Sequence, residues 1–190
     1  MLDNLYSYIT SQVPLTDEAW HDMQSILAPR QLRKKEHFLR QDEVCKYLGF
    51  ITEGYVRLYY LVDGVEVTKD FNFENWFCGS LASFSLQQPS RFNIVAMEPV
   101  TLLQTSRDNF YRTIDKHPAL QKLARLHLER MFIYNEQRET TFLLDTPEQR
   151  YRDLLSRQPG ILQRIPLKYI ASYLGIAPET LSRIRAGSMG

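Results

Sequence analysis

Hydrophobic and polar positions follow different spacings in successive parts of the chain. Near the start, Trp20, Met23 and Leu27 recur at the spacing of one helical face, and Thr16 precedes them as a candidate N-cap. From about residue 30 to residue 106 the pattern changes to short runs rich in aromatic and β-branched residues, separated by turn-forming residues. Many short strands at this spacing predict a small antiparallel barrel or sandwich.

The clearest predicted strand pair lies in the middle of this β-rich part. Residues 55–61 (YVRLYYL) and 65–69 (VEVTK) flank Asp63-Gly64, a pair that is typical of two-residue hairpin turns. The uncharged segment 75–90 has a different character, because its Gly, Ser, Gln and Pro residues indicate loops and turns. We therefore expect a hairpin, and after it an irregular segment.

A long helix is predicted to follow the β-rich part, from Pro118 to about Leu143. One of its faces is marked by residues at intervals of four, three, four and three: Leu120, Ala124, His127, Met131 and Tyr134. Two interpretations of this face remain open. The helix packs in a groove of its own domain, or it is buried twice, against its own domain and against a partner chain. These five residues are the candidate dimer-helix positions.

The most informative pattern lies in residues 165–185 (IPLKYIASYLGIAPETLSRIR). Two short helices are predicted around Gly175, which supplies a left-handed turn, and Pro178 suits the first turn of the second helix. Their inward positions are apolar: Ile170, Ala171, Leu174, Leu181 and Ile184. This arrangement is that of a helix-turn-helix, and the alternative is a helical hairpin that only packs.

The residues left on the surface of this motif have the chemistry of DNA recognition. Arg183 can donate two hydrogen bonds to guanine O6 and N7, and Glu179 can accept one from cytosine N4 or orient Arg183. Residues 159–190 carry a net charge of +3, whereas the whole chain carries +1. Neighbouring polar residues are suited to phosphate contacts. We expect DNA contacts from Lys168, Tyr169, Glu179, Thr180, Ser182, Arg183 and Arg185.

Composition narrows the remaining function classes. The 190 residues include two cysteines and four histidines without metal-ligand spacing, so no metal site and no required cofactor are predicted. The absence of G-x-S-x-G, Walker and H-E-x-x-H motifs argues against an enzyme. No Lys or Arg precedes Arg30, and no run of ~18 apolar residues occurs. We therefore expect a cytoplasmic protein without a secretory signal or membrane span.

A second motif, residues 50–59 (FITEGYVRLY), looks like the f-I-x-x-G-x-v-R-l hairpin of a known family. Nearly the whole chain resembles the cyclic-AMP receptor and fumarate–nitrate regulator (Crp–Fnr) family of bacterial transcription factors. The resemblance implies an α+β fold in three parts. These are an antiparallel, jelly-roll-like sensor barrel of the cyclic-nucleotide-binding type (1–117), a dimerisation and linker helix (118–144), and a helix-turn-helix domain (145–190) whose wing is short or absent.

The same resemblance implies a function. A homodimer would regulate transcription by binding a palindromic operator in double-stranded DNA, with RNA polymerase as a further partner and no membrane. Glu179 and Arg183 fall where the family places its base-reading Glu and Arg. The alternative, suggested by the short end of the sequence, is a ligand-sensing or protein-interaction module that has lost DNA binding.

The effector pocket is the part that departs from the family pattern. In cyclic-AMP binders, a Gly-Glu pair is followed about ten residues later by Arg-Ser or Arg-Thr; the acid holds the ribose hydroxyl and the Arg pairs with the cyclic phosphate. Here Ser80 replaces the Glu, Ser90 replaces the Arg, and Arg91 lies one residue away, on the other face of an extended segment. The pocket candidates are Gly79, Ser80, Leu81, Ala82, Pro89, Ser90 and Arg91. No particular effector is predicted, and cyclic AMP is not expected to bind. The alternative is that Arg91 serves another anion in a reshaped loop.

Overall fold

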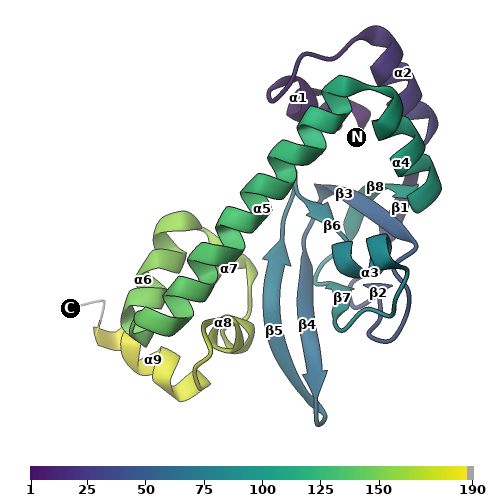
Figure 1. Ribbon diagram of the computed structural model, residues 1–190. Helices are drawn as coiled ribbons and strands as arrows, with labels where there is room; N and C mark the ends of the chain where they lie inside the picture. Colours follow the sequence, from purple (N-terminus) through teal and green to yellow (C-terminus); the bar gives the residue numbers. More distant parts are fainter. Residues whose placement is uncertain (188–190) are drawn as a thin grey trace. The chain divides into compact units, whose positions relative to one another are not determined.

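The computed structural model describes residues 1–187 and divides into two compact units, Met1–Leu128 and a second that begins at Glu129. Helix α5 (Pro118–Leu144) runs from the first unit into the second (Figure 1), which confirms the predicted long helix. The boundary between the units falls within the predicted dimerisation helix, and the division into three domains stays a prediction. Within the described residues, no helix is long and apolar enough to cross a membrane.

The first unit is built on two four-stranded antiparallel sheets, which confirms the predicted mixed α and β fold. One sheet has the order β1-β8-β3-β6 and contains Ala28–Leu32, Val100–Ser106, Tyr47–Glu53 and Phe77–Cys78. The other has the order β2-β7-β4-β5 and contains His37–Leu39, Asn93–Ala96, Val56–Val62 and Val65–Asn72. Ile51 and Leu102 of the first sheet join Leu58 and Ile94 of the second in one buried cluster, so the main core lies between the two sheets.

The predicted hairpin is confirmed as the connection between β4 and β5. Val62 pairs with Val65, and the two residues between them, Asp63 and Gly64, have φ of 50° and 80°. Two successive residues with positive φ form the type I′ turn that matches the twist of antiparallel strands.

Helices cover the outer face of the β1-β8-β3-β6 sheet. Leu5 and Ile9 of α1 (Leu2–Thr10) share a buried cluster with Phe50, Leu103 and Leu120. The remaining helices of this unit are α2 (Asp17–Ser25), α3 (Leu81–Leu86) and α4 (Arg107–Lys116). The predicted N-terminal helix corresponds to α2, while α1 precedes it and was not anticipated.

The prediction that segment 75–90 forms only loops and turns is wrong, since it contains β6 and the short helix α3. The helix is anchored by Phe84, which is completely buried, and ends at Gln87 with φ of 54°. Six residues with one deeply buried anchor show no helical periodicity, so tertiary packing decides this element.

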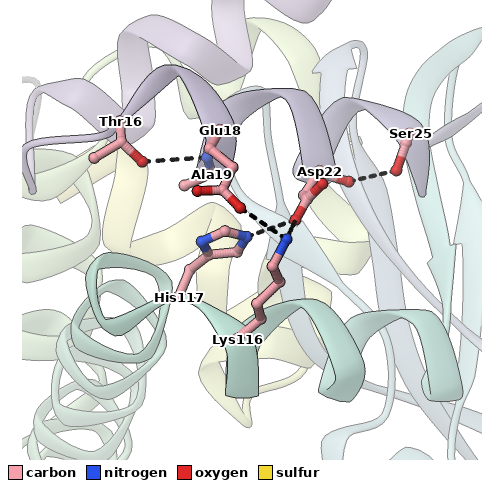
Figure 2. A network of polar contacts seen from close by, with 7 residues as sticks. All are labelled: Thr16, Glu18, Ala19, Asp22, Ser25, Lys116 and His117. Carbon is pink, nitrogen blue, oxygen red and sulfur yellow. Dashed lines mark hydrogen bonds and ion pairs between the residues drawn. The ribbon is translucent and has the colours of Figure 1, made fainter.

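A polar network fixes the joint between α4 and α5 against α2 (Figure 2). Lys116 Nζ lies 2.9 Å from Glu18 Oε1 and 2.7 Å from Asp22 Oδ2, and His117 Nε2 lies 2.8 Å from the same Asp22 oxygen. Hydrogen bonds from Lys116 and then His117 lower the pKa of the Asp22 carboxyl. At the start of α2, Thr16 Oγ1 accepts a bond from the Ala19 N–H, as predicted for an N-cap.

The second unit is helical throughout its described residues. After α5 come α6 (Pro147–Arg157), α7 (Ile161–Arg164), α8 (Leu167–Leu174) and α9 (Pro178–Gly187). Helix α6 starts with a capping box, in which Thr146 Oγ1 accepts from the Gln149 N–H and Gln149 Oε1 accepts from the Thr146 N–H. Tyr151 and Leu154 form the buried side of α6.

Candidate nucleic-acid interface and effector cassette

The turn between α8 and α9 has the predicted helix-turn-helix geometry. Gly175 has φ of 68°, in the left-handed region. Its N–H donates to the Ser172 carbonyl at 3.1 Å, and the Ile176 N–H donates to the Ala171 carbonyl at 3.0 Å. These two bonds form a Schellman motif, which satisfies the last carbonyls of α8 and sends the chain sharply into α9.

The two helices share a buried apolar core. All five residues assigned to the inward faces are buried, which confirms the apolar pattern: Ile170, Ala171, Leu174, Leu181 and Ile184. Ala171 has no exposed surface, in keeping with a position at which steeply crossing helices leave room for only a small side chain. The orientation of α9 is therefore tied to that of α8.

The opposite side of α9 is polar and faces solvent. Glu179, Ser182 and Arg183 are exposed, and Thr180 and Arg185 are half-buried. Arg183 Nη2 donates to Thr180 Oγ1 at 3.3 Å, one turn earlier on the helix. The guanidinium thus lies along the exposed face of α9, beside the carboxylate-bearing first turn.

The N-terminal part of α8 adds a cation to the same motif. Lys168 is exposed, and its Nζ lies 4.8 Å from the centroid of the half-buried Tyr169 ring. Helix α9 continues to Gly187, and residues 188–190, on which the prediction of a short or absent wing partly rests, lie outside the described residues.

The effector candidates lie in two segments that flank α3. Gly79 and Ser80 connect β6 to α3, and Ser90 and Arg91 precede β7. The two serines that replace the charged pair are buried, at 3% and 1% exposure, while the side chain of Arg91 is exposed. The other candidates are also exposed: Leu81, Ala82 and Pro89.

We call these two segments, residues 79–82 and 89–91, the effector cassette. Hydrogen bonds within the chain hold both segments in place. The Ser80 N–H donates to Cys45 Sγ at 3.4 Å, and Ser90 Oγ donates to the Phe92 carbonyl at 2.9 Å. Between them, Ser83 Oγ accepts from the Cys45 N–H at 2.8 Å and donates to the Gln88 carbonyl.

These residues do not fit a cyclic nucleotide. Arg91 is the only charged residue in the sequence from 79 to 91, and its exposed side chain is not gathered into the cassette with the buried serines. A cyclic phosphate is negatively charged, and the buried serines could offer it hydroxyl and main-chain donors but not the bidentate ion pair that a guanidinium supplies. The cassette therefore lacks the charged pair that the resemblance associates with cyclic AMP.

The dimer-helix candidates make contacts within their own chain. Leu120 is 1% exposed in the cluster beneath α1, and the His127 ring lies 4.7 Å from that of Phe77. Tyr134 Oη lies 3.0 Å from Tyr173 Oη of α8. Ala124 and Met131 are half-buried. The exposed apolar residues of α5 lie elsewhere, at Leu128, Phe132, Ile133, Phe142, Leu143 and Leu144.

The periodic pattern did not single out the residues that join α5 to α8. Arg138 of α5 stacks on the ring of Tyr173, with its Cζ 3.9 Å from the ring centroid. The two residues are 35 positions apart in sequence and carry no local motif, so no sequence signal points to the pair.

Comparisons with known proteins agree with this architecture. Residues 29–117 match the model of the cyclic nucleotide-binding domain family. A search of curated proteins finds no match. FixK2 from Bradyrhizobium japonicum has a similar structure, with a TM-score of 0.75 at 18% identity over 85% of this chain and 84% of that chain.

Two further solved structures share the fold. A CooA mutant from Carboxydothermus hydrogenoformans has a TM-score of 0.71 at 18% identity, over 93% of this chain and 86% of that chain. A protein from Eubacterium rectale, assigned to the crp/fnr family of transcriptional regulators, has a TM-score of 0.68 at 18% identity, over 90% and 82%. Residues 29–117 therefore form a domain of the cyclic nucleotide-binding family, in a chain that has the fold of Crp/Fnr regulators.

Proposed function

We propose that this chain is a homodimeric transcription regulator that binds DNA through α8 and α9. The observation that carries the proposal is the two-sided surface of α9. Leu181 and Ile184 are buried, while Glu179 and Arg183 are exposed on the opposite side. A helix anchored on one side, with a guanidinium and a carboxylate on the other, suits a major groove about 12 Å wide.

Each exposed residue has a role in this proposal. Arg183 reads guanine, and Glu179 accepts from cytosine N4 or orients Arg183. The remaining polar residues contact phosphates and fix the register without reading bases: Lys168, Tyr169, Thr180, Ser182 and Arg185. Double-stranded DNA with a palindromic site is thus the partner, and RNA polymerase would be contacted from the bound dimer.

The exposed apolar residues of α5 support a dimer. Phe132 and Ile133 are 70% and 53% exposed, and Leu128 lies one turn before Phe132 in the same helix. Large apolar side chains gathered on a helix surface are typical of interaction sites. A Phe132→Glu, Ile133→Glu double variant should sediment as a monomer at concentrations where the wild-type chain is a dimer. A wild-type monomer would contradict this part of the proposal.

Selection of bound sequences from random DNA tests the DNA-binding function. We expect a palindrome whose half-sites lie about 34 Å apart, and an affinity that falls with salt at a slope of about −0.9 per phosphate contacted. No selected sequence and no gel shift at low salt would contradict the proposal and favour a sensing module without DNA binding.

Two substitutions separate base reading from phosphate contact. Arg183→Ala should lose discrimination at one base position of each half-site by about 1–3 kcal/mol, which is roughly 5- to 150-fold. Lys168→Ala should weaken binding to all sequences alike and reduce the salt slope by about 1. Both side chains are exposed, so both variants should fold as the wild type does. Unchanged discrimination in Arg183→Ala would remove this residue from the reading surface.

A further inference from the structure

Arg138 lies at the centre of a cation–π stack in the second unit. Its Cζ is 3.9 Å from the centroid of the Tyr173 ring of α8 and 4.8 Å from that of the Phe142 ring of α5. A guanidinium within about 6 Å of an aromatic ring is attracted to it, and the planar group allows stacking on two rings. The stack joins the second half of α5 to the first helix of the helix-turn-helix.

Hydrogen bonds fix the same two helices at the same point. Arg138 Nη2 donates to the main-chain carbonyl of Tyr173 at 3.3 Å. This carbonyl belongs to the last turn of α8, where carbonyls lack partners within the helix and a cation is favoured by the helix dipole. One turn earlier on α5, Tyr134 Oη lies 3.0 Å from Tyr173 Oη. Tyr173 is thus held by its ring, its hydroxyl and its carbonyl.

The turn of the helix-turn-helix packs against the same stack. A Cβ atom on Gly175 would lie 2.9 Å from Phe142 Cε1, so the ring of Phe142 lies directly against the turn. On α6, Arg150 has its Cζ 5.1 Å from the centroid of the Phe142 ring and donates from Nη1 to the Asp145 carbonyl at 3.0 Å. Helices α5, α6 and α8 therefore meet at one aromatic and cationic cluster.

We propose that Arg138 is a positioning residue that sets the angle at which α5 carries the reading helix α9. This inference rests on the proposed function. Because α8 and α9 share a buried core, a constraint on α8 at Tyr173 fixes the direction of α9 as well. In a homodimer built on α5, the constraint acts twice and defines the separation of the two reading helices.

The separation of half-sites is the quantity that this constraint controls. One base pair inserted at the centre of an operator moves one half-site by about 3.4 Å and rotates it by about 35°. A dimer with firmly held reading helices discriminates strongly against such a change. A dimer whose α8 can turn on α5 adapts to it, at the cost of affinity for the correct site.

The test measures affinity for three operators in three variants of the full chain. The operators are the sequence obtained by selection and two derivatives with one central base pair inserted or deleted. Arg138→Ala removes the stack and the hydrogen bond, and Arg138→Lys keeps the charge without the planar group. Arg152→Ala is the matched control, because Arg152 is an exposed residue of α6 and its loss changes the net charge equally.

We expect Arg138→Ala to bind the selected operator about tenfold more weakly, with a much smaller loss on the altered operators. The ratio of their dissociation constants should therefore fall severalfold, less in Arg138→Lys, and not in Arg152→Ala. A variant that is only less stable lowers the active fraction for every operator and leaves the ratio unchanged. An unchanged ratio in both Arg138 variants would overturn the inference, whereas failure of the wild-type chain to bind any operator would overturn the proposed function instead.

Discussion

Replacing Gly175 with Ala tests the turn on which the reading surface depends. Gly175 has φ of 68°, a conformation that costs a residue with a Cβ about 1–2 kcal/mol. The new Cβ would also meet Phe142 Cε1 at 2.9 Å. Since Phe142 is 39% exposed and the clash is with the far end of its side chain, the ring can move aside at a further cost of about 1 kcal/mol.

The structure therefore predicts a loss of about 2–3 kcal/mol in the opening free energy of the helix-turn-helix. Hydrogen exchange of the backbone amides in α8 and α9, followed by mass spectrometry, measures this quantity locally. At about 1.4 kcal/mol per factor of ten, exchange should become roughly 25- to 150-fold faster. DNA affinity should fall as well, because displaced Phe142 is part of the stack on Arg138.

Two other glycines separate the contributions. Gly64 has φ of 80° with nothing within 4 Å of its Cβ position, so Gly64→Ala introduces backbone strain without a clash. Gly160 has φ of −88° and equally open surroundings, so Gly160→Ala should change local stability by less than about 0.5 kcal/mol. Exchange in α8 and α9 that is as slow in Gly175→Ala as in the wild type would refute the assigned turn geometry.

Three further predictions concern the first unit. Asp22→Asn removes the charged acceptor that Lys116 and His117 share (Figure 2). Because the pKa of Asp22 is lowered below its usual 3.8, the carboxylate stabilises the folded chain above about pH 4, and this stabilisation is lost at lower pH. The unfolding curves of variant and wild type should therefore separate above about pH 4 and converge below it. Burial raises the pKa of Cys45, and that of Cys78 to about 12, so a thiol reagent at about pH 8 should label neither before unfolding and both after it. Cyclic AMP should leave the melting temperature unchanged, whereas any ligand at 100 times its Kd adds ~2.7 kcal/mol.

Elements whose conformation depends on residues close together in the sequence could be predicted. The left-handed Gly175, the apolar spacing around it and the Asp63-Gly64 pair each act within a few residues, and the structure has them as expected. The long helix from Pro118 was predictable for the same reason. Local conformational preferences act in the unfolded chain as well, so they can be recognised in the sequence without knowledge of the fold.

Features that depend on distant partners could not be predicted. The face of α5 that contains Leu120 and His127 is apolar, but periodicity alone does not tell that α1 and Phe77 cover it. The contact between Arg138 and Tyr173 joins residues without any motif. The short helix α3 depends on the burial of one side chain. In each case the deciding interaction is a tertiary contact. The sequence pattern around one residue does not identify the distant residue that contacts it.

At both positions where the resemblance places a charged residue of the cassette, this chain has a buried serine. A charge buried without a partner costs several kcal/mol, whereas a buried hydroxyl needs only a hydrogen-bond partner. Ser80 and Ser90 stand at both charged positions, each is buried, and main-chain or hydroxyl bonds hold their segments. A domain without a buried unpaired charge needs no bound anion to remain folded. Because no buried cassette residue carries a charge to pair with a cyclic phosphate, we expect cyclic AMP to leave the stability of the first unit unchanged.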